Sequence, residues 1–336
     1  MLSAAGKVVH RDRCPTTIPA LGGVVRAVAR PRPLVIDEGP RAGWLWRHRR
    51  GAVDPRVVGD PRRNRLIAPD GDQDGDPDAA KLARLLRGGF VQAVHQRESL
   101  ERAAFKQPVA RYHHRVRQRV REGLRLTGRF RQHGVLIREK GDVAVADRPA
   151  LRGRLPAGAA RRELVAAPGV SDDARAEQEG AWRKRLVQSA QAAAAVRRSQ
   201  ELPGVGWARA AALYAYRDTP WRYRSKAALG KYLGIGRERR RWGSGPEHWG
   251  VPRRAHRRLQ GTTRGAARSA AASGGNPFAD RSRRWAEQGR SAKLARRNVA
   301  RALAAALGGR WRNGSTYRPE WVGAAAAAPT ATPAPR

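Results

Sequence analysis

Arginine and lysine outnumber aspartate and glutamate by 69 to 28, and this imbalance limits what the chain can fold into more than any other feature. The resulting net charge of +41 opposes compaction at low salt, which favours a polyanionic partner. Nucleic acid is the partner we expect, with an anionic membrane as the alternative. Part of the excess is also explained by composition, because most of the basic residues are arginines accompanied by alanine, glycine and proline, as a GC-rich genome encodes. The 336 residues, 40% of them hydrophobic, suffice for two domains with cores.

The single cysteine, Cys14, excludes an internal disulfide and a cysteine-rich zinc site. No stretch of the sequence approaches the ~20 apolar residues of a membrane-spanning helix, and the first residues lack the apolar core of a signal peptide. We therefore expect a cytoplasmic, nucleoid-associated protein with no membrane partner.

Periodicity divides the chain into segments of different character. Short apolar runs at 7–10, 34–36 and 57–58 alternate with helical patterns at 42–46 and from residue 76, which is typical of an α/β domain. Apolar residues at steps of three and four then predict a long amphipathic helix. The same spacing predicts a last helix from about Ser291 to Leu307, with Gly308 and Gly309 as its stop. The expected organisation is an α/β domain at 1–98, a helical arm at 99–200 with a linker at 141–170, a mostly helical domain at 201–322 and a disordered tail at 323–336.

Acidic residues are rare enough here that their positions are informative. Asp37 and Glu38 follow the apolar run 34–36, at a strand end where α/β folds often place chemistry. The run 70–78 contains Asp74, Asp76 and Asp78 where a loop enters a predicted helix. Clustered carboxylates can hold Mg²⁺ and so assist phosphodiester cleavage. The alternative is a solvated acidic turn favoured by the helix dipole.

The segment 202–206, LPGVG, matches the turn of a helix-hairpin-helix. Gly204 and Gly206 would let backbone N–H groups approach a phosphate at a helix N-terminus, although a plain turn between helices is equally compatible. Basic residues follow, with tryptophans between them, and we expect most of these arginines to contact phosphate and most of the tryptophans to pack in the core. These arginines are Arg237, Arg239, Arg240, Arg241, Arg253, Arg254, Arg257 and Arg258.

Two further motifs show no catalytic or metal-binding pattern in the spacing of their residues. His113 and His114 have no acidic or cysteine partner at ligand spacing, so we expect them to face solvent. Ser244 has no neighbouring His or Asp that would complete a hydrolase triad.

Several segments together resemble a known family, the insertion-sequence transposases with a DEDD-type RuvC-like domain and a C-terminal domain that carries a serine, known as bridge-RNA-guided recombinases. The resemblance extends over about residues 6–322, and the segments that carry it are 60–64, 78–86, 202–206, 217–229, 232–236, 276–280, 296–301 and 313–321.

The resemblance implies an α/β RNase-H-like (RuvC-like) N-terminal domain, a long helical arm, and a mostly α-helical C-terminal domain with a helix-hairpin-helix-like element. It implies DNA cleavage and rejoining in transposition of an insertion sequence, guided by RNA. The implied partners are the element ends and target DNA, a guide RNA and further copies of the chain on DNA. The implied cofactor is Mg²⁺.

Carried over residue by residue, the family's strand-end glutamate falls on Asp37, with Glu38 beside it, and the second of its paired aspartates falls on Asp78. The first of the pair falls on Gly75, so that Asp74 or Asp76 would substitute. The nucleophilic serine aligns with Trp242, and Ser244 lies two positions later. The family's first aspartate would precede Met1, so the resemblance leads us to expect an N-terminally truncated copy.

Three interpretations follow. In the first, the chain is an active transposase in which Asp37, Glu38, Asp74, Asp76 and Asp78 supply the metal ligands and Ser244 attacks phosphate. In the second, it is a catalytically dead remnant that still binds nucleic acid. In the third, it is a basic RNA-binding structural protein unrelated to transposases.

Overall fold

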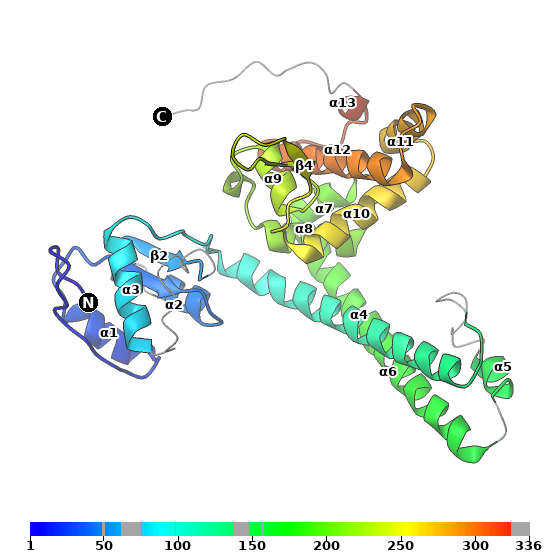
Figure 1. Cartoon of the computed structure of the whole chain (residues 1–336), viewed down its shortest axis with the longest axis horizontal. Coiled ribbons are helices and arrows are strands. Elements are labelled where there is room, and N and C mark those ends of the chain that lie inside the picture. The colour runs from blue at the N-terminus through cyan, green and yellow to red at the C-terminus, as the bar shows by residue number, and fades with distance from the viewer. Residues whose placement is uncertain (49–50, 62–74, 98, 138–147, 156–157, 324–336) are drawn as a thin grey trace. The chain divides into compact units, whose positions relative to one another are not determined.

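The computed structural model describes the chain apart from residues 49–50, 62–74, 98, 138–147, 156–157 and 324–336. It is mostly helical and divides into two units, Met1–Leu100 and Glu101–Arg336 (Figure 1). The boundary between the two units, after Leu100, lies close to the predicted end of the α/β domain at residue 98. The predicted arm and C-terminal domain, in contrast, fall within one unit.

The first unit is built on a βαβ arrangement. Its elements are α1 (Ile18–Arg26), β1 (Leu34–Asp37), α2 (Ala42–His48), β2 (Arg56–Gly59) and α3 (Gly75–Arg87). The two strands are parallel, in register from Leu34 opposite Arg56 to Asp37 opposite Gly59, and α3 packs against β1. This confirms the expected strands at 34–36 and 57–58 and the helix at 42–46. The expected strand at 7–10 is wrong, because its only pairing is an isolated bridge between Leu2 and Val8.

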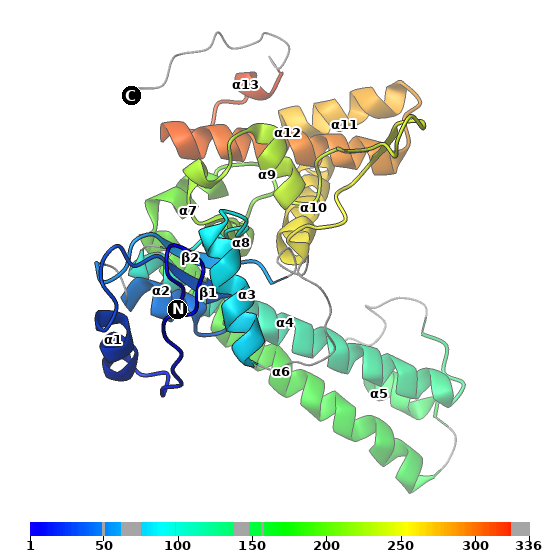
Figure 2. The same ribbon diagram turned by 60° about the vertical axis from the view of Figure 1, so that its left-hand side comes forward.

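In its described residues, the second unit is helical apart from one small hairpin. Its elements are α4 (Leu100–Gln132), α5 (Arg148–Gly153), α6 (Ala159–Ala192), α7 (Ala194–Gln200), α8 (Trp207–Arg217), η4 (Pro220–Arg222), α9 (Lys226–Tyr232), β3 (Glu238–Arg240), β4 (His248–Gly250), α10 (Arg257–Ala272), α11 (Pro277–Glu287), α12 (Ala292–Asn313) and α13 (Glu320–Gly323). The helices α4 and α6 run side by side as an arm (Figures 1 and 2).

The arm is held by a buried carboxylate and by a small apolar cluster. Glu122 on α4 is buried, and its carboxylate lies 3.0 Å from Arg125 on the same helix and 3.4 Å from Arg175 on α6. The cluster at the far end contains Leu126, Phe130, Val135, Ile137, Leu151 and Leu155. The predicted linker at 141–170 is wrong in its described part, because α5 and the beginning of α6 lie there. Alanine-rich sequence outweighs the glycines and prolines that suggested a linker.

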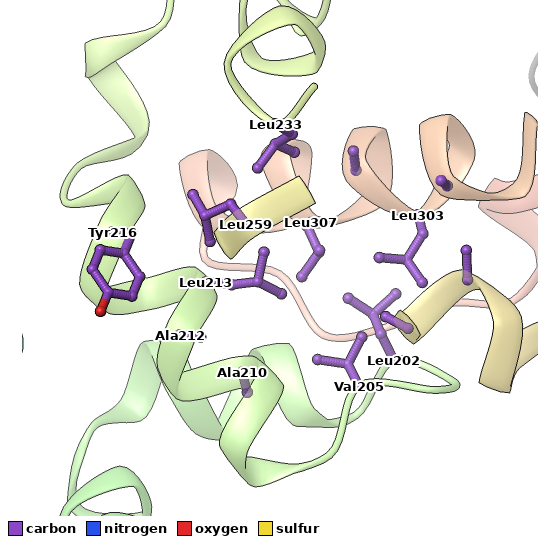
Figure 3. Close-up of a cluster of buried hydrophobic side chains, with 14 of the residues drawn as sticks. Leu202, Val205, Ala210, Ala212, Leu213, Tyr216, Leu233, Leu259, Leu303 and Leu307 are labelled. Atoms are coloured by element: carbon purple, nitrogen blue, oxygen red, sulfur yellow. The ribbon is translucent and has the colours of Figure 1, made fainter. Parts of the chain in front are cut away.

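The main core joins the base of the arm to the C-terminal helices (Figure 3). Val109 on α4 and Leu186 on α6 are fully buried in the same cluster as Leu213, Leu259 and Leu303. The alanines of α8 at 210–212 are also fully buried, and their small side chains allow neighbouring helices to approach closely. The arm is therefore continuous in packing with the C-terminal domain.

The last long helix begins where the sequence predicts and ends later. The Ser291 hydroxyl caps α12 by accepting a hydrogen bond from the Leu294 N–H at 3.3 Å. The predicted stop at Gly308 and Gly309 is wrong, because the helix continues to Asn313 and ends at Gly314, whose φ is 64°. A Cβ at Gly308 would lie 3.1 Å from the Leu229 side chain, so the glycine allows α9 to pack closely.

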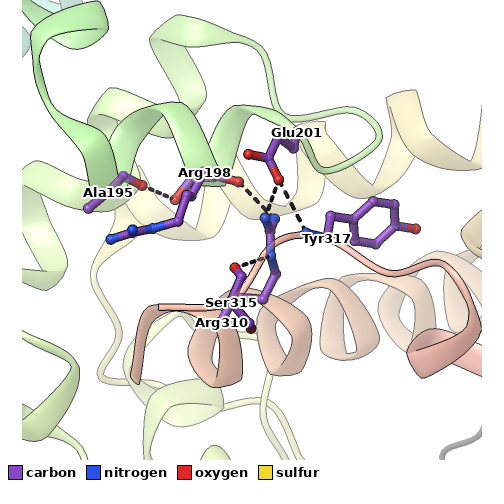
Figure 4. A network of polar contacts seen from close by, with 7 residues as sticks. Ala195, Arg198, Glu201, Arg310, Ser315 and Tyr317 are labelled. Atoms are coloured by element: carbon purple, nitrogen blue, oxygen red, sulfur yellow. Dashed lines mark hydrogen bonds and ion pairs between the residues drawn. The ribbon is translucent and has the colours of Figure 1, made fainter. Parts of the chain in front are cut away.

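A buried arginine ties the end of α12 to the turn before α8 (Figure 4). The Arg310 guanidinium donates to the Glu201 carboxylate, to the Arg198 carbonyl at 2.7 Å and to the Ser315 carbonyl at 3.2 Å. The Tyr317 N–H also donates to Glu201, at 3.2 Å. Because burial makes an unpaired charge costly, this network fixes the segment after α12 against α7.

Candidate nucleic-acid interface

The β3–β4 hairpin rises from a tightly packed glycine turn. Gly234 has a φ of +68°, and a Cβ there would lie 2.5 Å from the Gln260 side chain. A Cβ at Gly236 would likewise lie 2.8 Å from the carbonyl carbon of Gly230. Ile235 between them is fully buried, and its carbonyl accepts a hydrogen bond from Arg301 at 2.8 Å. The base of the hairpin is therefore anchored to both α10 and α12.

The strands of the hairpin pair in antiparallel register and use several arginines for their own stability. Arg239 forms an ion pair with Glu247 at 3.0 Å, and Arg240 forms one with Glu238 at 2.9 Å. This hydrogen bond from Arg240 is the main reason that the pKa of Glu238 is lowered. The guanidinium of Arg237 stacks on the Trp249 ring, 4.4 Å from its centroid.

The tip of the hairpin is open to solvent. Trp242 is 95% exposed, and Trp249 on β4 is 53% exposed. The expectation that the tryptophans pack in the core is therefore wrong for this pair. Gly243 has a φ of 55°, and the Gly245 N–H donates to the Trp242 carbonyl at 3.0 Å, which closes a tight turn around Ser244. Ser244 is exposed at this tip.

The eight arginines expected to contact phosphate separate into those engaged within the protein and those facing solvent. Arg258 joins Arg237, Arg239 and Arg240 in the engaged group, because it donates a hydrogen bond to the Tyr216 hydroxyl. The solvent-facing residues, which we call the exposed arginine set, are Arg241, Arg253, Arg254 and Arg257. They flank the hairpin tip or lie between β4 and the first turn of α10.

The segment 202–206 forms a turn between α7 and α8, and Gly204 is required there for packing. Its φ is +75°, and a Cβ would lie 2.2 Å from the Ala266 carbonyl oxygen and 2.7 Å from the Ala270 N. The turn is thus pressed against α10 by its glycine. Gly206 differs, because it is exposed at the N-terminus of α8 and has open space around its Cα.

Two histidines of the second unit are kept neutral by burial. Desolvation, together with repulsion from Arg258, lowers the pKa of His256 to about 4. The Nδ1 atom of His256 accepts the Leu259 N–H at 3.2 Å and so caps α10. Desolvation likewise lowers the pKa of His113 to about 4, with added repulsion from Arg258 and Arg117. His113 is half-buried, so the expectation that it faces solvent is wrong.

The acidic residues proposed as metal ligands belong to the first unit, whereas Ser244 belongs to the second. Asp37 ends β1, Glu38 follows it, and Asp78 lies in the first turns of α3; all are exposed. Asp74 lies outside the described residues, and Asp76 lies in α3. Across the described part of the chain, no three His, Cys, Asp or Glu side chains gather as a metal site would require.

A scan of protein-family models finds none that matches this chain, and a search of curated proteins also finds no match. In the part of the chain that the structure describes, no helix combines the length and apolar character needed to cross a bilayer.

Proposed function

We propose that this protein binds nucleic acid through the β3–β4 hairpin and the exposed arginine set. The observation that carries the proposal is the anchored hairpin, which exposes Trp242 and Trp249 to solvent. The exposed arginine set beside it forms no ion pair within the described structure, unlike Arg239 and Arg240. Arginines contact phosphate without regard to sequence, and exposed aromatic rings stack on unpaired bases. Binding of this type is strong, sensitive to salt and tolerant of sequence.

We further propose that this binding serves DNA transposition. The support is the resemblance of about residues 6–322 to RNA-guided insertion-sequence transposases, together with the exposure of Ser244 at the hairpin tip. In the proposed reaction the Ser244 Oγ attacks the phosphorus of a phosphodiester, the bond to the leaving sugar oxygen breaks, and the serine proton passes to that oxygen. A second sugar hydroxyl then reverses this step and rejoins the strand. Element ends, target DNA, a guide RNA and further copies of the chain are the proposed partners.

Mg²⁺ belongs to this proposal only as an implied cofactor. The exposed carboxylates of Asp37, Glu38 and Asp78 are hard oxygen ligands of the type that Mg²⁺ prefers. They do not by themselves complete a site among the described residues, so Asp74 and Asp76 would have to contribute. The alternative is a remnant that binds nucleic acid but has lost the chemistry.

The experiment is a strand-cleavage and strand-joining assay on supercoiled plasmid carrying the element ends and transcript, with Mg²⁺ or with EDTA. Ser244→Ala and Asp78→Ala are compared with Ser189→Ala, which changes an exposed serine on α6. The transposase proposal expects Mg²⁺-dependent products that only the control variant retains. Plasmid that is shifted on a gel but never cut would leave the binding proposal standing and refute the chemistry.

A further inference from the structure

A second candidate site is a pocket of about 460 Å³ beside α12. Its wall is formed by the start of α9, by α11, by α12 from Asn298 onward and by the segment that follows α12. The charged and polar side chains that line it are Lys226, Arg281, Asn298, Arg301, Arg310, Asn313, Ser315, Tyr317 and Arg318.

The electrostatics of the pocket favour an anion. Five of its lining residues are cationic, and no aspartate or glutamate lines it among the described residues. Arg310 is engaged with Glu201 and with carbonyl oxygens, so its charge is largely neutralised. The Arg301 Nε donates to the Ile235 carbonyl, and burial together with repulsion from Arg237 and Arg297 lowers the pKa of Arg301. A bound anion would relieve this repulsion.

Polar atoms at the pocket lack the partners that burial normally requires. The Nε of Arg281, the Oγ of Ser315 and the phenol oxygen of Tyr317 are each shielded from solvent and have no hydrogen-bond partner within the described structure. Leaving a buried polar group unpaired is unfavourable. The three residues that carry these atoms come from two separate segments and line the same pocket, so we look for their partner in a ligand bound there.

The size and the remaining groups narrow the class of ligand. A volume of about 460 Å³ exceeds what a bare phosphate ion fills and lies within the range of small-molecule sites. Asn298 and Asn313 supply amides of the type that pair with base edges. Tyr317 adds an aromatic ring, which Figure 4 shows on the segment just after α12.

We propose that this pocket binds a nucleoside 5′-phosphate, with Arg281 and Arg301 on the phosphate and Ser315 and Tyr317 donating their hydroxyl protons to the ligand. The same phosphate monoester exists in a free nucleotide and at the 5′ end of a nucleic-acid strand. The proposal does not rest on the hairpin, because no residue of the exposed arginine set lines the pocket.

The test is isothermal titration of the full chain with ribonucleoside 5′-monophosphates, with the matching nucleosides and with inorganic phosphate. Arg281→Gln is compared with Arg283→Gln, which changes an exposed arginine on the same helix that pairs with Asp280 at 3.5 Å. We expect saturable binding of at least one monophosphate, weakened about tenfold or more by Arg281→Gln and unchanged by Arg283→Gln, since a hydrogen bond to a charged group contributes 1.5–3 kcal/mol. Nucleosides are expected not to bind.

A second variant, Ser315→Ala with Tyr317→Phe, keeps the pocket charges and removes only the hydroxyl donors. It tests the proposal even if Arg281→Gln does not fold. It should also weaken monophosphate binding, and thermal unfolding will confirm that each variant is folded.

Competition by a short 5′-phosphorylated strand, but not by its 5′-hydroxyl form, would assign the site to strand ends. Competition by neither strand would assign it to free nucleotide. Equal affinity of Arg281→Gln and Arg283→Gln for every monophosphate, or saturable binding of none, would overturn the proposal. Binding that survives loss of the exposed arginine set would show that the pocket is independent of the proposed function.

Discussion

Replacing Gly204 with alanine tests whether the turn before α8 exists for packing or for binding phosphate. The backbone at φ +75° costs an alanine about 1–2 kcal/mol. The new Cβ would also lie 2.2 Å from the Ala266 carbonyl oxygen, which is helix backbone and cannot rotate away. Overpacking of this type costs about 1–3 kcal/mol more. We therefore expect a loss of about 3 kcal/mol, which for a domain of this size lowers the melting temperature by roughly 6–12 °C.

Gly206→Ala is the matched control, because Gly206 has a φ of −73° and nothing within 4 Å of the position of a Cβ. It should cost less than about 1 kcal/mol, as expected for losing a glycine at a helix N-cap. Urea unfolding of both variants measures the difference. The packing argument would be refuted if the two variants unfolded within about 0.5 kcal/mol of each other. A folded Gly206→Ala variant that lost nucleic-acid binding would instead support a phosphate contact at the α8 N-terminus.

Two further predictions concern buried charge. Arg310→Met removes the donor shared by Glu201, Arg198 and Ser315, and it should lower the free energy of unfolding in urea by about 2–3 kcal/mol. The control Arg290→Met, at an exposed arginine, should leave that free energy almost unchanged. Equal losses in the two variants would contradict the role of this network. The second prediction concerns His113, whose pKa is lowered to about 4 by desolvation, so the unfolded chain takes up the proton first as the pH falls. Its contribution to stability is therefore complete above pH ~6.5 and is lost between pH ~6.5 and ~4. When the pH is lowered from 7 to 5, the free energy of unfolding of His113→Gln should fall by about 1 kcal/mol less than that of the parent chain, after allowance for partial exposure. Identical dependence of the two unfolding free energies on pH would contradict this.

The elements that could be predicted from sequence are those set by local rules. The strand at 34–36 is a short apolar run between turn residues, and Ser291, which precedes α12, is a favoured N-cap residue. In both cases the signal lies within a few residues, so no tertiary information is needed. The same rules fail at Gly308, where the close approach of Leu229 explains the glycine and the helix continues.

The hairpin could not be predicted, because its strands are very short and rich in arginine. Arg239 and Arg240 would normally indicate a solvated loop, and only their backbone pairing with Trp249 and His248 makes them part of a sheet. The anchoring of its base depends on α10 and α12, which follow later in the sequence. Such contacts are long-range and leave no local pattern.

The sequence predicted which residue types form the candidate site, but not which role each arginine has. The sequence indicated that the arginines between 237 and 258 matter, yet it could not separate those that stabilise the hairpin from the exposed arginine set. It also offered no sign of the pocket, because Arg281, Ser315 and Tyr317 come from separate segments and only the fold brings them together. The RNase-H-like fold of the first unit stays a prediction, since the described βαβ arrangement is too small to identify it.

The central claim is that nucleic acid binds at the hairpin, and the salt dependence of binding tests it most directly. The affinity of the full chain for duplex DNA is measured over a range of salt concentrations and compared with two variants of equal charge. One changes the exposed arginine set to glutamine, and the other changes exposed arginines of α11, α12 and the turn between them, namely Arg283, Arg284, Arg290 and Arg296.

Each phosphate contact contributes about 0.9 to the negative slope of log K against log salt, so losing the exposed arginine set should reduce that slope by up to ~3.6. The control variant should leave the slope nearly unchanged. Equal reductions in both variants would show that the overall charge binds DNA without a defined surface, and a parent slope near zero would contradict nucleic-acid binding altogether.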